Sequence, residues 1–200
     1  MDAILAAIRS GEIKNAKACV VMSNNPRSMG LTIASEKYGI PTEVIPQGVL
    51  KGWQYDQKVV AVLQNHGVTP DSGLVCLAGF MRILSPPFVK HYRMRIMNIH
   101  PALLPSFRGL HAQKQALEYG VKVTGCTVHF IDEGIDSGPV IMQKAVPVLD
   151  GDDEESLSAR ILEQEHLLYP KAVEIFCEGK IKIIGRRVSM SKSSAGLTDA

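Results

Sequence analysis

Short apolar runs alternate with longer stretches in which apolar residues recur every three or four positions, as far as about residue 184. The short runs are typical of buried strands, and the longer stretches have the period of helices that pack on a sheet. This alternation predicts an α/β protein with a Rossmann-like, mostly parallel twisted sheet and helices on both faces. The predicted strands are residues 18–22, 42–45, 74–78, 96–100, 123–130, 140–148 and 181–184. The predicted helices are residues 1–9, 31–38, 55–65, 113–119 and 155–178, with a short one after Pro87.

The chain reads as one domain. Its 200 residues are enough to bury a substantial core. No repeat or linker divides the sequence, so residues 1–185 are predicted to form a single domain. Residues 186–200, which are rich in Ser and small residues, are predicted to be a disordered tail. The strands at 123–130 and 140–148 flank a short loop, and we expect them to run antiparallel.

Charge and cysteine usage exclude several classes of partner. The net charge is +2, and segment 186–200 accounts for it, with three basic residues and one acidic residue. The rest of the chain is neutral, so we expect neither nucleic acid nor an anionic membrane as a partner. Four cysteines without metal-binding spacing are typical of buried thiols in a reducing compartment. With no membrane-spanning run and no signal peptide, the sequence predicts a cytoplasmic protein.

Two polar residues interrupt the apolar run 96–100. Asn98 and His100 lie two positions apart, so their side chains share one face of the predicted strand. An Asn amide can donate to a developing oxyanion, and a His with a pKa near neutrality can transfer a proton. Asp136 lies in a glycine-bracketed loop further on, where a carboxylate could hold that His in its charged form. The three residues predict acyl transfer without a protein nucleophile.

Each of these residues also has a plainer interpretation. Asn98 and His100 alone are equally typical of a strand end with locally satisfied polar groups, and Asp136 alone is typical of a turn. His129, on a strand of alternating character, is predicted to be a hydrogen-bonded structural residue. His100 and His111 lack the spacing of a metal pair, so no metal site is predicted. No Ser or Cys lies in a nucleophile motif.

Several segments form a longer pattern when they are read together. They are Leu77–Ser85, Asn98–Pro101 with Leu103–Pro105, Gly109–Ala112, Gly125–Phe130, Asp136–Pro139 and Glu165–His166. In this order they resemble the phosphoribosylglycinamide formyltransferases, the folate-dependent enzymes of purine synthesis. The resemblance extends from Met1 to about Ile184.

The resemblance implies transfer of a formyl group from 10-formyltetrahydrofolate, a co-substrate, to the amine of glycinamide ribonucleotide in purine (IMP) biosynthesis. It implies that Asn98 stabilises the oxyanion, that His100 donates a proton, and that Asp136 raises the pKa of His100. It further implies that Gln164 and Glu165 bind the nucleotide. The implied folate-binding residues are Met81, Arg82, Ile83, Leu84, Asn98, Asp132, Glu133, Gly134, Ile135 and Asp136.

The start of the chain departs from this family. Members begin with a strand and a Ser-Gly-x-Gly-Ser-Asn turn that holds the substrate phosphate, whereas Met1–Ile8 matches the helix after that turn. Either Met1 is an internal methionine of a longer chain, or the protein lacks the phosphate cradle. We expect the first, because a missing central strand exposes two strand edges. The sheet is thus expected without its first strand, and no phosphate-loop residue can be named.

Two other functions stay open. A 10-formyltetrahydrofolate hydrolase would use the same Asn, His and Asp with water as the acceptor. The segments Gly109–Ala112 and Glu165–His166 favour the transferase over that hydrolase. A non-catalytic folate-binding protein is the alternative if the phosphate cradle is truly absent.

Overall fold

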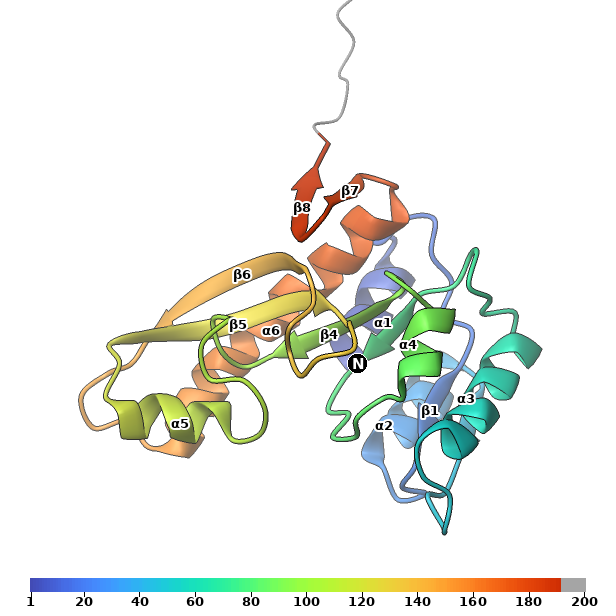
Figure 1. Ribbon diagram of the computed structural model, residues 1–200, viewed down its shortest axis with the longest axis horizontal. Coiled ribbons are helices and arrows are strands. Elements are labelled where there is room, and N and C mark those ends of the chain that lie inside the picture. Colours follow the sequence, from blue (N-terminus) through green and yellow to red (C-terminus); the bar gives the residue numbers. More distant parts are fainter. Residues whose placement is uncertain (192–200) are drawn as a thin grey trace, which may run out of the picture.

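The strands of the first half of the chain pair in parallel (Figure 1). In the computed structural model, which describes residues 1–191, β1 (Val21–Ser23) pairs with β2 (Thr42–Val44). β3 (Val75–Leu77) pairs with β4 (Ile96–His100) in the same sense. Helices lie between these strands along the chain, because parallel strands need a connection that returns to the same end of the sheet.

The second half of the sheet is antiparallel. β4 pairs on its other side with β5 (Val123–Phe130), and β5 pairs with β6 (Val140–Pro147). The loop that carries Asp136 joins β5 to β6, and a short loop can join antiparallel neighbours without a crossover. The predicted α/β class and the predicted antiparallel pair are both confirmed.

The last described segment forms a hairpin. β7 (Ile181–Ile184), a predicted strand, pairs antiparallel with β8 (Arg187–Met190), and this hairpin lies beside β6 (Figure 1). The prediction of a disordered tail over residues 186–200 is therefore wrong for β8. The physical reason is the turn, because Gly185 adopts a φ of 60°, which two-residue hairpin turns require. The rest of that prediction, residues 192–200, lies outside the described residues.

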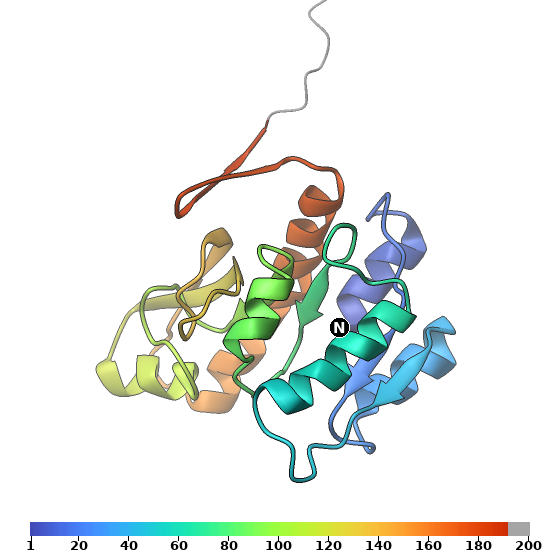
Figure 2. The same ribbon diagram turned by 45° about the vertical axis from the view of Figure 1, so that its right-hand side comes forward.

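The helices cover both faces of the sheet. α1 and α6 pack against each other on one face, while α3 and α4 lie on the other, as Figure 2 shows. No helix within residues 1–191 is both long and apolar enough to cross a membrane. The helices are α1 (Asp2–Ser10), α2 (Met29–Thr32) with its π-helical continuation η1 (Ile33–Lys37), α3 (Trp53–Asn65), α4 (Pro86–His91), α5 (Ala112–Tyr119) and α6 (Glu154–Cys177).

Alternation along β3 divides the apolar side chains between two cores. Cys76 packs with the core formed by α1, α6 and the antiparallel strands. Its neighbours Val75 and Leu77 pack with the core formed by α3 and α4. Successive side chains of a strand point to opposite faces, so a continuous apolar run is what a strand covered on both faces requires.

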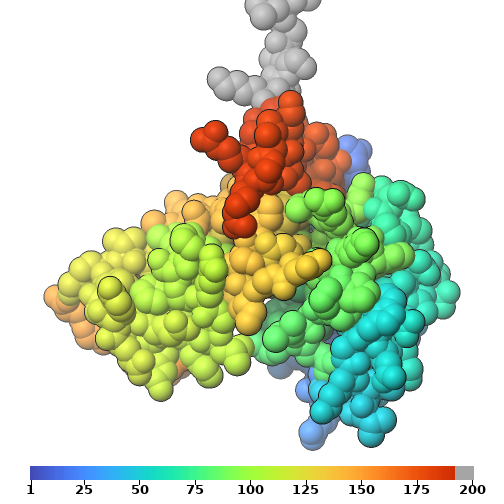
Figure 3. All heavy atoms as spheres, viewed as in Figure 1, coloured from blue at the N-terminus to red at the C-terminus, as the bar shows by residue number. Residues whose placement is uncertain are grey.

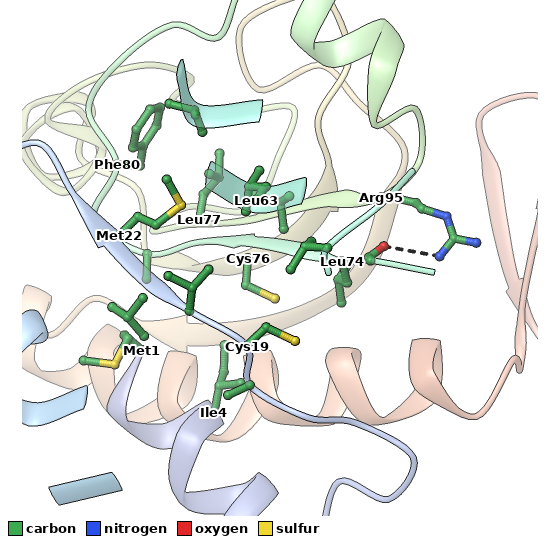
Figure 4. Close-up of a pocket in the computed structure, with 18 of the residues that line it drawn as sticks. Met1, Ile4, Cys19, Met22, Leu63, Leu74, Cys76, Leu77, Phe80 and Arg95 are labelled. Carbon is green, nitrogen blue, oxygen red and sulfur yellow. Dashed lines mark hydrogen bonds between the residues drawn. The ribbon is translucent and has the colours of Figure 1, made fainter. Parts of the chain in front are cut away.

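A gap divides the parallel half of the sheet. Within residues 1–191, β1 and β3 each pair on one side only, and they do not pair with each other. A cavity of about 810 Å³ lies there, lined by both strands and by α1, α3 and α6. Figure 4 shows Cys19 and Met22 on one side of this cavity and Cys76 and Leu77 on the other.

Both predicted strands that border this gap lose residues at their ends in the structure. Residues 18–22 were predicted as a strand, but β1 begins only at Val21, and β3 lacks both end residues of the predicted 74–78. In contrast, β4 and β5 have the predicted bounds, because each of them has a strand partner on both sides.

Candidate functional site

One face of β4 and β5 carries polar side chains at the centre of the sheet. Asn98 lies directly opposite His129 in the antiparallel register, and His100 lies opposite Thr127. Residues of the alternate set, such as Met97, are fully buried in the core beneath α6. The strand period thus separates an apolar face from a polar one, as the spacing of Asn98 and His100 predicts.

The loop between β5 and β6 has a shape set by its own side chains. The Asp132 carboxylate accepts a hydrogen bond of 2.5 Å from the Ser137 hydroxyl. A side chain at Gly138 would overlap the carbonyl of Phe130, so only glycine permits this close return of the chain. Asp136 itself has a φ of 45°, a conformation that Asp tolerates better than most residues. In Figure 3 the loop lies at the surface of the face shown.

This loop brings the Asp136 carboxylate to His100. Asp136 Oδ2 lies 3.4 Å from His100 Nδ1 and accepts a hydrogen bond of 2.8 Å from the Gly109 amide. His100 Nε2 lies 2.8 Å from the Phe107 carbonyl, which only accepts, so this nitrogen carries a proton. His100 is 4% exposed, and both of its ring nitrogens face oxygen atoms. Each ring nitrogen of His100 therefore faces a hydrogen-bond acceptor.

Asn98 contacts a second histidine. Its Nδ2 atom lies 3.4 Å from His129 Nε2, which in turn is 3.7 Å from Asp136 Oδ1. Burial lowers the pKa of His129, and the hydrogen bond to the Phe130 carbonyl and the Asp136 carboxylate act against this effect. The structure thus brings together the three residues that the sequence singled out and adds His129, which the sequence analysis assigned a structural role.

Apart from Asn98 on β4, the residues implied to bind folate lie in two loops. Met81 and Ile83, between β3 and α4, are 77% and 80% exposed, so both present apolar surface to solvent. The Arg82 guanidinium lies 4.1 Å from the centre of the Tyr55 ring, and Leu84 packs on the α3 and α4 core. In the other loop, Asp132 accepts the hydrogen bond from Ser137, and the middle of segment 132–136 is exposed to solvent. The residues exposed there are Glu133, Gly134 and Ile135.

Gln164 and Glu165 lie on α6 and are half-buried. Burial raises the pKa of Glu165 to about 7, and the amino group of Met1 acts in the opposite direction. Within residues 1–191, no hydrogen bond or ion pair joins Glu165 to Asn98, His100 or Asp136. The structure does not bring these two sets of predicted residues into direct contact.

Backbone groups complete the site, and the sequence analysis did not identify them. The Phe107 carbonyl and the Gly109 amide contact His100 and Asp136, and both residues have a positive φ, of 52° and 79°. For a bulky residue such as Phe107 this conformation is strained, and such strain is found most often at functional sites. Every residue carries the same main-chain groups, so the sequence does not show which of them take part in the site. Of these two residues, only Gly109 indicated a turn.

Chemically, the site offers an amide donor, an imidazole and a carboxylate on one face. Within the described part of the chain, no group of three or more His, Cys, Asp or Glu side chains is arranged to hold a metal ion. A fixed N–H donor stabilises a developing oxyanion, and an imidazolium can deliver a proton to a leaving group. The arrangement suits the addition of a nucleophile to a carbonyl group.

Comparisons with known proteins point the same way. A family model described as formyl transferase matches residues 1–173. The phosphoribosylglycinamide formyltransferase of Escherichia coli strain K12 is 41% identical, over 92% of this chain and 84% of that protein. The trifunctional purine biosynthetic protein adenosine-3 of Drosophila pseudoobscura pseudoobscura is 46% identical over 98% of this chain. The chain spans 14% of the length of that trifunctional protein.

A solved structure has the same fold. It is the crystal structure of glycinamide ribonucleotide transformylase 1 from Symbiobacterium toebii, which is 45% identical and superposes with a TM-score of 0.90. The match covers 96% of this chain and 88% of that one.

Proposed function

The chain belongs to the formyl transferase family, and we propose that it transfers the formyl group of 10-formyltetrahydrofolate to the amine of 5′-phosphoribosylglycinamide, a step of purine biosynthesis. The observation that carries the proposal is the convergence of Asn98, His100 and Asp136 on one face of β4. In particular, Asp136 Oδ2 lies 3.4 Å from His100 Nδ1. Both substrates are small molecules, and the four free thiols support a cytoplasmic location.

The proposed reaction needs no protein nucleophile. The glycinamide amine attacks the formyl carbon, and a new C–N bond forms as the carbonyl oxygen takes the negative charge. The amide of Asn98 donates a hydrogen bond to this oxygen. The imidazolium of His100, balanced by Asp136, supplies the proton that the leaving N10 nitrogen needs as its bond to carbon breaks. The proton lost by the attacking nitrogen returns to His100 through water.

Substrate positions follow from the surroundings of this trio. The pterin of the folate is assigned to the loops at 81–84 and 132–136. Each loop has exposed apolar side chains together with main-chain groups that can form hydrogen bonds. Backbone N–H and C=O groups have fixed directions, which suits recognition of a flat heterocycle. The carboxylate of Glu165, with Gln164 beside it, is assigned to the hydroxyl groups of the ribose.

The test is consumption of 10-formyltetrahydrofolate by the 200-residue chain, measured with and without glycinamide ribonucleotide. We expect consumption only when the nucleotide is present, with one formylated nucleotide formed per tetrahydrofolate released. In the His100→Ala variant the rate is expected to fall about 100-fold or more, because the proton donor is lost. Folate binding, followed by the quenching of Trp53 fluorescence or by calorimetry, is expected to persist.

His91→Ala is the matched control, since His91 is an exposed residue of α4, and it is expected to behave as the unmodified protein. Consumption without the nucleotide, with release of formate, would identify a hydrolase instead. Folate binding without turnover of either kind would contradict both enzymatic functions.

A further inference from the structure

His129 is a buried histidine that the proposed reaction does not use. It lies on β5 with no exposed surface, directly opposite Asn98. The pairing of β5 with β6 shifts register between Val128 and His129, and such irregularities often redirect a side chain near an active site. A buried imidazole needs a partner at both nitrogens, so its contacts define its protonation state.

The two contacts fix one tautomer. His129 Nδ1 lies 2.9 Å from the Phe130 carbonyl oxygen, which accepts but cannot donate, so Nδ1 carries the proton. Burial lowers the pKa of His129 by more than the Phe130 carbonyl and the Asp136 carboxylate raise it, which favours the neutral ring. A neutral ring protonated at Nδ1 has a free lone pair at Nε2. The atom that faces this lone pair at 3.4 Å is Asn98 Nδ2, a donor.

This contact determines which way the Asn98 amide points. If the amide were rotated by half a turn, its oxygen would face the Nε2 lone pair, and two acceptors would repel each other. With His129 in place, one N–H of the amide is bound to Nε2 and the second N–H is left for another acceptor. Nε2 also lies 3.7 Å from Asp136 Oδ1, beyond hydrogen-bond distance, so Asn98 is its closer partner.

We propose that His129 is a positioning residue that holds the Asn98 amide in the one orientation that offers an N–H to the formyl oxygen. The inference rests on the proposed function, because the orientation matters only if Asn98 meets an oxyanion. His129 itself neither touches the substrate nor moves a proton. It acts through the side chain opposite it.

Two variants separate the roles of the two ring nitrogens. The end of a Gln side chain reaches about as far as Nε2, so His129→Gln can still present an acceptor to Asn98. The shorter His129→Asn reaches only the position of Nδ1 and leaves Asn98 without its partner. We expect His129→Asn to lower kcat about 10- to 100-fold, part of the loss typical of a missing oxyanion donor, with KM for the folate nearly unchanged. His129→Gln should retain most of the activity.

The Asn98→Ala background decides whether His129 acts through Asn98. In the Asn98→Ala variant, the additional change His129→Asn should alter kcat less than about threefold, because no amide remains to be positioned. An equal loss in both backgrounds, or an equal loss for the Gln and Asn variants, would overturn the proposal. Circular dichroism and thermal melting of each variant separate these losses from misfolding.

A second measurement does not depend on turnover. The ¹⁵N signals of the imidazole rings in the unmodified protein should show His129 neutral, protonated at Nδ1 and unprotonated at Nε2, between about pH 6 and pH 8. A proton on Nε2 would overturn the inference even in an active enzyme. If the protein transfers no formyl group but His129 has the expected tautomer, the proposed function fails and the hydrogen-bond assignment stands.

Discussion

At the residue scale, two histidines near one carboxylate differ in the atoms that face their ring nitrogens. His100 has an oxygen atom at each ring nitrogen, from Phe107 and from Asp136. His129 has an oxygen at Nδ1 but the amide nitrogen of Asn98 at Nε2, and burial lowers its pKa. The ring of His100 can donate at both nitrogens, whereas the contacts of His129 favour the neutral ring. Neighbouring groups of one type can take different roles for this reason.

Asp136→Asn is expected to lower the rate of formyl transfer about 100-fold, because a neutral amide cannot balance the imidazolium of His100. The measurement is kcat at a fixed pH with both substrates saturating. Asp150→Asn is the matched control, since the side chain of Asp150 is 98% exposed and pairs only with Lys122. Similar rates for the two variants would contradict the role given to Asp136.

Glu165 is expected to make stability depend on pH. Burial raises its pKa from 4.5 to about 7 in the folded protein, so the folded state binds a proton more tightly than the unfolded state. The stabilising effect is complete below about pH 4.5 and is lost as the pH rises through 7. The loss amounts to at most about 3.5 kcal/mol, since one pKa unit corresponds to about 1.4 kcal/mol.

The test is thermal unfolding of the unmodified protein and of Glu165→Gln between pH 5 and pH 8. The variant should be similar to the unmodified protein at pH 5 and clearly more stable at pH 8, because Gln stays neutral. Glu163→Gln, at an exposed position of the same helix, should leave the pH dependence unchanged. Parallel curves for Glu165→Gln and the unmodified protein would refute the assignment.

At the scale of elements, a loop and a strand end determine the site. β4 supplies Asn98 and His100 in a fixed relation, because pairing on both sides holds the strand. The loop between β5 and β6 supplies Asp136, and its path depends on the Asp132–Ser137 hydrogen bond and on the close approach at Gly138. The contact between Asp136 and His100 therefore depends on the conformation of this loop.

Gly138→Ala is expected to displace the loop, since the added methyl group would overlap the main-chain carbonyl of Phe130. We expect a loss of roughly 1–3 kcal/mol in the free energy of unfolding, as for overpacked sites, and a larger relative loss of transfer activity. Denaturant unfolding and kcat measure the two effects. Gly151→Ala is the control, because Gly151 lies before α6, outside this loop, and its positive φ of 86° also makes an added side chain unfavourable. That variant should lose stability and keep its activity.

At the scale of the whole molecule, the sheet consists of two parts with different support. The antiparallel part has β5 at its centre, paired on both sides and covered by α6. In the parallel part, β1 and β3 face a cavity of about 810 Å³ across which they do not pair. Unpaired strand edges and an incompletely filled core both reduce stability, so the parallel part is expected to open more easily.

Hydrogen exchange is expected to report this difference. The amides of Val21 and Val75 are bonded to the neighbouring strand at 2.9 and 2.8 Å. Because bonding alternates from side to side along a parallel strand, the amides of Met22 and Cys76 point toward the cavity. We expect these two to exchange at least about tenfold faster than Val21 and Val75, and far faster than Val128 on β5. Equal protection at all five positions would show that the edges are not open in solution.

The sequence by itself determined the α/β class, most of the helices and strands, and the shared face of Asn98 and His100. These follow from local periodicity, because a strand exposes alternate residues and a helix every third or fourth one. It also gave the order of motifs on which the resemblance to formyltransferases rests. β8 was missed because it has only four residues, which is too short for its alternation to stand out beside a Ser-rich segment, and only Gly185 indicated the turn.

Only the tertiary structure decided how the chemistry is assembled. The contacts of His100 with the Phe107 carbonyl and of Asp136 with the Gly109 amide join main-chain groups, which have no signature in a sequence. The pairing of His129 with Asn98 depends on strand register, and residues 31 positions apart become direct neighbours only once the sheet has formed. Electrostatic roles depend on burial and distance in space, so the contacts of the two histidines could be assigned only from the folded structure.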